Sequence, residues 1–126
     1  MLEKDQDDVY ITVSTIKELG IDTAVKFVND FEELMTFLSS PDKPSLILLS
    51  YHSPPMSIRD MLEQLKTSAD FYHIPVVVLS EDITESEVTD CYRMGANSII
   101  KKPASVEMTT TKMQTFFRYW FQVAEL

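Results

Sequence analysis

Two short, wholly aliphatic runs constrain the fold more than any other feature of this sequence. Leu46-Ile47-Leu48-Leu49 ends at Ser50, and Ile74-Pro75-Val76-Val77-Val78-Leu79 ends at Ser80. A run with no polar face suits a strand that is covered on both sides, as in a parallel sheet between two layers of helices. Open sheets of this kind bind ligands beyond the carboxyl ends of their strands. Ser50 and the loop 51–55 therefore occupy the position of the expected site.

Helical periodicities and capping residues separate the predicted strands. Asp7 or Asp8, Asp30, Ser57 and Thr84 are the expected N-caps. The segment 9–13 is rich in β-branched residues, which also suit a strand, but helix is favoured there. The predicted helices are 9–19, 31–39, 58–65, 84–95 and 105–124, and further strands are predicted at 24–28 and 98–100.

This alternation predicts an α/β fold with three layers, α-β-α, around a doubly wound, parallel, five-stranded sheet. The first strand must be short or atypical, because only Met1-Leu2 precedes the acidic segment 3–8. A length of 126 residues with 44% hydrophobic residues fits one domain, 1–126, with its own core.

The charge of the chain narrows the classes of partner. Twenty acidic and 11 basic residues give a formal net charge of -9, which disfavours nucleic acid and anionic membranes and favours protein partners. The lone cysteine, Cys91, has no partner for an internal disulfide. With no leader and no apolar run of about 18 residues, a cytoplasmic location is expected.

The order of these segments resembles the receiver domain of two-component response regulators. The motifs that carry the resemblance are the strand 46–49 followed by Pro54, the strand 74–80, Gly95-Ala96-Asn97, and Lys102-Pro103. The opening Glu3-x-Asp5-x-Asp7-Asp8 and the closing Phe117-x-x-Trp120-Phe121 are similar, more loosely, to the single-domain regulators associated with phytochromes.

The resemblance also implies roles for individual positions. Active receivers hold Mg²⁺ on an acidic pair, accept a phosphoryl group on an aspartate, and use a hydroxyl, an aromatic switch residue and a lysine before a cis proline. By position these roles fall on Glu3 and Lys4, Ser50, Ser80, Ile99, and Lys102 with Pro103. Only Glu3, Ser80 and Lys102 match the family pattern, and Ile99 lacks the size and the hydroxyl of a switch residue.

The substituted pocket predicts loss of phosphoryl transfer. A serine such as Ser50 is a weak nucleophile without an adjacent base, and the nearest histidine, His52, is expected in solvent. Glu3, Lys4 and Lys102 together carry a net charge of +1, which repels a divalent cation that wants carboxylate ligands. We therefore expect no metal or other cofactor, with Lys102 paired to Glu3 or to an anion.

Two other assignments follow from the same residues. Ser80 is interpreted equally well as a hydrogen-bonding residue at a strand end. Asp5, Asp7 and Asp8 are interpreted as capping and helix-dipole residues, and the alternative is that one of them supplies a metal ligand.

The last helix has more apolar residues than one buried face needs. Met113, Phe117, Trp120 and Ala124 form the stripe expected to face the sheet. The aromatic and aliphatic residues outside it predict a homodimer seam or a partner-binding patch. The alternative is that they pack under the loops and the C-terminal tail. The predicted contact residues are Phe116, Tyr119, Phe121 and Val123.

These features favour a degenerate receiver that works by binding a protein, such as a histidine kinase or another signalling protein, and is not an enzyme. One alternative is a working phosphoacceptor that uses Ser50 or a displaced aspartate. Another is a flavodoxin-like binder of a small ligand, which would want a hydroxyl- or glycine-rich phosphate loop where segment 4–8 is acidic.

Overall fold

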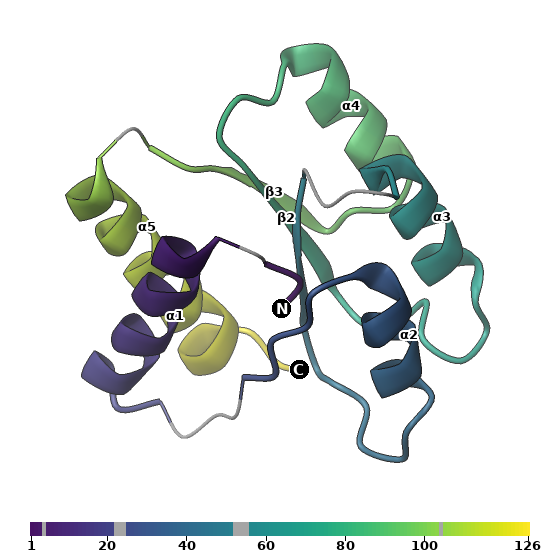
Figure 1. Cartoon of the computed structure of the whole chain (residues 1–126), viewed down its shortest axis with the longest axis horizontal. Helices are drawn as coiled ribbons and strands as arrows, with labels where there is room; N and C mark the ends of the chain where they lie inside the picture. Colours follow the sequence, from purple (N-terminus) through teal and green to yellow (C-terminus); the bar gives the residue numbers. More distant parts are fainter. Residues whose placement is uncertain (4, 22–24, 52–55, 104) are drawn as a thin grey trace.

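A parallel sheet of three strands runs through the middle of the chain (Figure 1). The computed structural model describes residues 1–3, 5–21, 25–51, 56–103 and 105–126. The strands β1 (Ile47–Ser50), β2 (Val76–Ser80) and β3 (Ser98–Lys101) lie side by side in that order. Both aliphatic runs therefore form neighbouring strands inside the sheet, as their lack of a polar face predicts.

Two further strand positions are each held by a single residue. Leu2 forms parallel bridges with Val28 on one side and with Leu49 of β1 on the other. The Leu2 amide donates to the Leu48 carbonyl (2.8 Å), and the Ser50 amide donates to the Leu2 carbonyl (3.0 Å). The expected short first strand is thus Leu2, flanked by Val28 and β1. The prediction of a strand over 24–28 is too long, because only Val28 pairs within the described part of that segment.

Helices cover both faces of the sheet, so the predicted α/β class is confirmed. One core lies between the sheet and α1 and α5, and a second lies between the sheet and α2, α3 and α4 (Figure 1). The helices are α1 (Gln6–Glu18), α2 (Phe31–Leu38), α3 (Ile58–Thr67), α4 (Glu85–Arg93) and α5 (Val106–Arg118), and α5 continues into the π-helix η1 (Tyr119–Val123).

Three of the predicted N-caps are confirmed. Asp30 accepts from the Glu33 amide, Ser57 accepts from the Asp60 amide, and Thr84 forms a capping box with a glutamate three residues on. Short polar side chains at these positions satisfy amides that have no partner inside the helix.

The predicted cap of α1 is wrong. Asp5, and not Asp7 or Asp8, accepts hydrogen bonds from the amides of the first turn. The helix begins at Gln6, and a cap residue must precede the first helical residue. Asp8 therefore lies inside the first turn, where its carboxylate is free to point toward the sheet edge.

The buried face of α1 also differs from the predicted stripe. Ile11, Thr12 and Thr15 are buried with Ile16, whereas Val13 is 50% exposed. The Thr12 hydroxyl donates to the Asp8 carbonyl (2.9 Å), which removes the cost of burying it. In the same way, Cys91 of α4 is buried as predicted, but Tyr92 is exposed.

Part of the predicted contact surface on the C-terminal helix is buried in the structure. Phe116 lies in the core with Phe117, because α5 packs against α1 as well as the sheet, so its buried face is wider than one stripe (Figure 1). Phe121 and Trp120 also pack against that core and are partly buried. Only Tyr119 and Val123 of the predicted contact residues are exposed.

Candidate functional site

The strand order brings the predicted site residues to one edge of the sheet. Ser50 ends β1, Ser80 ends β2, and Lys102 follows β3, while Glu3 follows the single bridging residue of the central position. The carboxyl ends of parallel strands meet at the same edge, so these residues converge there. Lys4, and with it His52 and Pro54 of the neighbouring loop, lie outside the described residues.

An ion pair network joins this edge to the first helix. The Lys102 Nζ donates to Glu3 Oε2 at 3.3 Å and also bonds to an Asp8 carboxylate oxygen. The side chains of Lys102, Glu3 and Asp8 are 10%, 4% and 14% exposed. The second Glu3 oxygen accepts from the Asp5 amide (3.1 Å). The predicted pairing of Lys102 with Glu3 is confirmed.

Asp8 is the site residue that the sequence did not reveal. The sequence analysis assigned Asp8 to the helix cap, but Asp5 is the cap residue, so the Asp8 carboxylate is available for the ion pair. One feature of the sequence could have indicated this role: Asp8 lies in the first turn of a helix that begins directly after the first strand. Glu3, Asp8 and Lys102 together carry one net negative charge, and Lys4, which the expected charge of +1 included, lies outside the described residues.

The network holds Lys102 in its charged form. Burial alone lowers the pKa of a lysine, but the hydrogen bond to Asp8 and the charges of Glu3 and Asp8 outweigh it, so the pKa of Lys102 is raised. The lysine is therefore a fixed positive charge between two carboxylates at neutral pH.

The two strand-end serines differ in their surroundings. Ser80 is buried, and its hydroxyl has no hydrogen-bond partner among the described residues, while its carbonyl accepts from the Lys102 amide (2.7 Å). Ser50 is partly buried and its amide belongs to the ladder with Leu2. Ile99 is partly buried and packs against the core under α3 and α4, and the Pro103 carbonyl accepts from Thr109 (3.3 Å).

The residues of the site do not fit the divalent cation that the family resemblance implies. Mg²⁺ takes an octahedron of oxygen ligands that includes carboxylates. Here the ammonium of Lys102 bonds to both carboxylates, Glu3 and Asp8, and Ser50 offers a hydroxyl where the family has a third carboxylate. Within the described ranges, no three His, Cys, Asp or Glu side chains gather as a metal-binding group.

A second set of hydrogen bonds links this edge of the sheet to α4 through Tyr51, which was not among the predicted site residues. Its hydroxyl donates to the Glu87 carboxylate, which also accepts from the Thr84 amide (3.1 Å) and hydroxyl (2.9 Å). Burial, followed by the Glu87 hydrogen bond and charge, raises the pKa of Tyr51. The residue after the acceptor position is therefore tied to the first turn of α4.

No helix in the described part of the chain is long and apolar enough to span a membrane.

Comparisons with known proteins agree with this geometry, although no family model matches the sequence. Response regulator Rcp1 of Synechocystis sp. is 26% identical over 133 residues, which cover 100% of this chain and 90% of that protein. Two-component response regulator ORR7 of Oryza sativa subsp. indica is 26% identical over 112 residues, 80% of this chain. The chain spans about half, 54%, of the length of the rice protein.

Solved structures show the same fold over nearly the whole chain. The Mn²⁺-bound form of response regulator Rcp1 superposes with a TM-score of 0.91 at 26% identity, covering 99% of this chain and 94% of that chain. The phosphorylated cyanobacterial phytochrome response regulator RcpA gives the same values. The chain therefore belongs to the receiver domains of response regulators. Within that class, it is similar to the phytochrome response regulators of cyanobacteria.

Proposed function

We propose that this receiver acts in two-component signalling by binding another protein and does not accept a phosphoryl group at Ser50. The observation that carries the proposal is the Lys102 ammonium, which bonds to both Glu3 and Asp8 beside a strand that ends in a hydroxyl. The expected partner is a histidine kinase or another protein of the same signalling system.

The chemistry of phosphoryl transfer supports this proposal. A metal ion normally neutralises the charge of the transferred group, and here a lysine side chain already neutralises the carboxylates that would bind the metal. A serine also needs a general base to act as a nucleophile. Two carboxylates at this edge of the sheet, Glu3 and Asp8, are both bonded to Lys102.

Incubation with acetyl phosphate and Mg²⁺ followed by intact-mass analysis tests the proposal. We expect no phosphoryl adduct on the wild-type chain or on Ser50→Ala. Ser50→Asp is the companion variant, because it restores a carboxylate at the acceptor position. A wild-type adduct that Ser50→Ala removes would refute the proposal, and an adduct that survives Ser50→Ala would assign the transfer to another residue.

We also propose that the exposed end of the C-terminal helix forms a homodimer seam. Tyr119 and Val123 are 52% and 68% exposed. Beside them lies a hollow of about 470 Å³ between η1, α5 and the edge strand β3. The hollow is lined by Asn97, Ser98, Ile100, Lys112, Thr115, Phe116, Tyr119 and Trp120. An aromatic side chain next to an edge hollow suits a self-complementary contact, in which each copy fills the hollow of the other.

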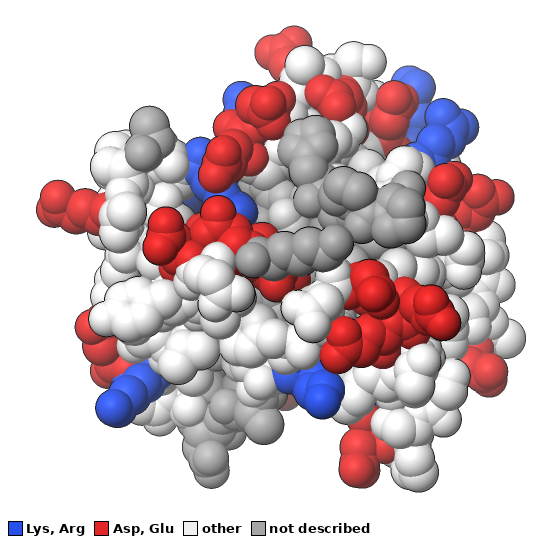
Figure 2. All heavy atoms as spheres, in the orientation of Figure 1, with Lys and Arg blue, Asp and Glu red and all other residues white. Residues whose placement is uncertain are grey.

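The charge of the surface supports a protein partner over nucleic acid. Figure 2 shows acidic side chains in several groups across one face, with few basic ones among them. With a net charge of -9, the chain repels a phosphate backbone.

Sedimentation velocity tests the proposed seam. We expect the wild-type chain to dimerise and Tyr119→Asp to be monomeric at the same concentration. Tyr10→Asp is the matched control, because Tyr10 is 73% exposed on α1, away from the hollow. Equal dimerisation of both variants would place the seam elsewhere.

A further inference from the structure

The helix α4 buries less of itself than any of the other α-helices in the described part of the chain. All nine residues of α4 are described, and Cys91 alone is buried. By comparison, α1, α3 and α5 each bury four side chains and α2 buries three. Val88 of α4 is partly buried and packs against the same core as Cys91. Elements with few buried apolar contacts are the ones that open locally while the rest of a domain stays folded.

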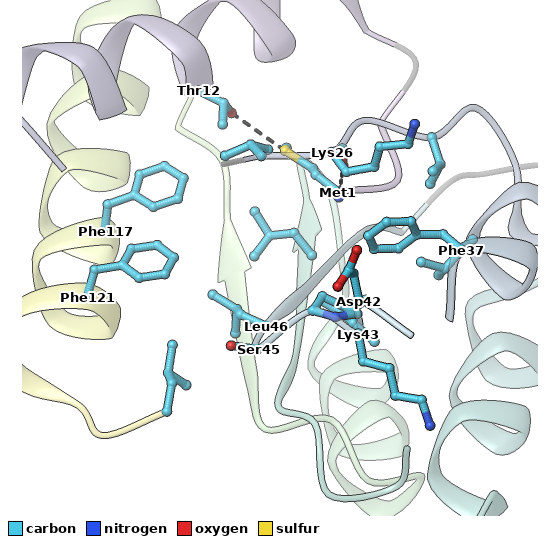
Figure 3. A pocket seen from close by; sticks show the side chains of 17 residues that line it. Met1, Thr12, Lys26, Phe37, Asp42, Lys43, Ser45, Leu46, Phe117 and Phe121 are labelled. Carbon is cyan, nitrogen blue, oxygen red and sulfur yellow. Dashed lines mark hydrogen bonds between the residues drawn. The ribbon is translucent and has the colours of Figure 1, made fainter. Parts of the chain in front are cut away.

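The C-terminal helix, on the other face of the sheet from α4, is held quite differently (Figure 1). Figure 3 shows Phe117 and Phe121 pointing from this helix into the pocket beside Leu46. Their rings stack with their centroids 5.9 Å apart, and the ring of Phe116 meets that of Phe117 edge-on at 5.0 Å. Several aromatic side chains therefore hold α5 and η1 in place, whereas α4 depends on smaller side chains.

Tyr51 supplies a further attachment for α4. It directly follows β1, and its amide donates to the Leu79 carbonyl of β2 (2.7 Å). Its side chain is partly buried against the core that also contains Cys91. The Tyr51 hydroxyl donates to the carboxylate of Glu87 in the first turn of α4. Tyr51 therefore connects the ends of β1 and β2 to the beginning of α4.

The acceptor of this hydrogen bond also caps α4. Glu87 Oε1 accepts from the Thr84 amide (3.1 Å) and from the Thr84 hydroxyl (2.9 Å), whereas the Tyr51 hydroxyl bonds to the other oxygen, Oε2. One oxygen thus closes the first turn of the helix, and the other ties that turn to the sheet edge. Removing the Tyr51 hydroxyl would break the tie and leave the cap in place.

The tie begins one residue after Ser50, at the acceptor-equivalent position. It reaches α4 without passing through Ser80 or Ile99, the positions to which the family resemblance assigns the hydroxyl and the switch residue. The Ser80 hydroxyl has no hydrogen-bond partner among the described residues, and Ile99 has no hydroxyl. Tyr51 therefore gives this edge of the sheet a connection to α4 of its own.

We propose that the hydrogen bond between Tyr51 and Glu87 is a latch that holds α4 closed, and that a perturbation at the Ser50 edge releases α4 while the sheet stays folded. Opening of α4 uncovers Cys91 and the core side chains that it covers. The latch goes beyond the proposed binding function and does not rest on it, because it joins this edge to α4 whatever occupies the edge.

Alkylation of Cys91 by iodoacetamide measures the opening of α4. The full chain has one cysteine, and it is buried, so the adduct seen by intact-mass analysis reports exposure of this residue. We expect Tyr51→Phe to react about tenfold faster than wild type, the effect of one lost hydrogen bond to a charged acceptor. Tyr72→Phe is the matched control, because Tyr72 is 57% exposed, and its rate should change by less than about twofold. Equal rates for the two variants would overturn the proposal.

The urea dependence of alkylation separates release of α4 from unfolding of the whole domain. Global unfolding exposes far more surface than local opening, so alkylation through global unfolding accelerates steeply with urea. We expect the rates of wild type and Tyr51→Phe to depend only weakly on urea well below the unfolding transition. Rates that follow the full urea dependence of global unfolding would overturn the proposal.

A double-mutant cycle tests the connection to the Ser50 edge. Ser50→Asp adds a negative charge one residue from a hydrogen bond whose acceptor is already a carboxylate, and like charges repel. We expect it to speed alkylation by at least about threefold in the chain with Tyr51 and by less than about twofold when it is combined with Tyr51→Phe. An equal effect with and without the Tyr51 hydroxyl, or no effect in either, would overturn the proposal. Circular dichroism checks folding, and Ser50→Glu replaces Ser50→Asp in the cycle if that variant does not fold.

Discussion

Replacing Lys102 by methionine tests most directly whether the ion pairs of Lys102 with Glu3 and Asp8 stabilise the fold. The change removes the ammonium but keeps an apolar stem of similar length. It removes the cation that bonds to Glu3 and Asp8, whose side chains are only 4% and 14% exposed. Breaking a buried ion pair from one side costs about 3–5 kcal/mol, because the remaining charge stays desolvated.

We expect a loss at the lower end of that range, about 3 kcal/mol in the free energy of unfolding. Asp8 lies in the first turn of α1, where the helix dipole favours a negative charge, and this offsets part of the cost. For a chain of 126 residues, a loss of that size lowers the melting temperature by about 10 °C. Urea denaturation with a linear extrapolation measures the change.

Two further variants distinguish the loss of the ion pairs from a nonspecific effect of replacing a lysine by methionine. Lys101→Met is the matched control, because Lys101 is exposed at the end of β3, and we expect a change within about 0.5 kcal/mol. The double variant Glu3→Gln with Lys102→Met also removes one of the two carboxylates that bond to Lys102, so it should recover part of the loss. A loss for Lys102→Met under about 1 kcal/mol, the size typical of exposed pairs, would refute the buried network.

The pH dependence of the loss provides an independent check. The pKa of Lys102 is raised in the folded chain above its ordinary value of 10.5. The stabilisation from its charge is therefore fully present below about pH 10.5 and is lost as the pH rises through the raised pKa. We expect the stability difference between wild type and Lys102→Met to stay constant near neutral pH and to shrink only at strongly alkaline pH.

Two other predictions concern the connection to α4 and the tight turns. Tyr51→Phe should cost about 1.5 kcal/mol through the lost hydrogen bond to Glu87, and it should remove the last step of a spectrophotometric tyrosine titration. If that last step persists in the variant, the assignment is wrong. Gly95→Ala should destabilise more than Gly20→Ala in urea denaturation. Both glycines have positive φ. A Cβ at Gly95 would lie 2.7 Å from the Lys66 side chain, whereas a Cβ at Gly20 would have no neighbouring heavy atom within 4 Å among the described residues. Equal losses would contradict the predicted clash.

Local patterns accounted for the class of fold and for the edge where the site lies. The aliphatic runs before Ser50 and Ser80 have no polar face, so they must lie inside a covered sheet whatever the rest of the chain does. The caps Asp30, Ser57 and Thr84 act within one helical turn, and for that reason they were readable without any long-range contact.

Contacts between distant segments decided the rest. Asp8 and Lys102 are 94 residues apart, and their ion pair depends on where α1 begins and how it is rotated against the sheet edge. Phe116 is buried because α5 meets α1 as well as the sheet, a contact that periodicity along one helix does not report. The pairing of Leu2 with both Val28 and Leu49 likewise depends on segments that are far from Leu2 in the sequence. Such features depend on helix rotation and on spaces between elements, which no single stretch of sequence specifies.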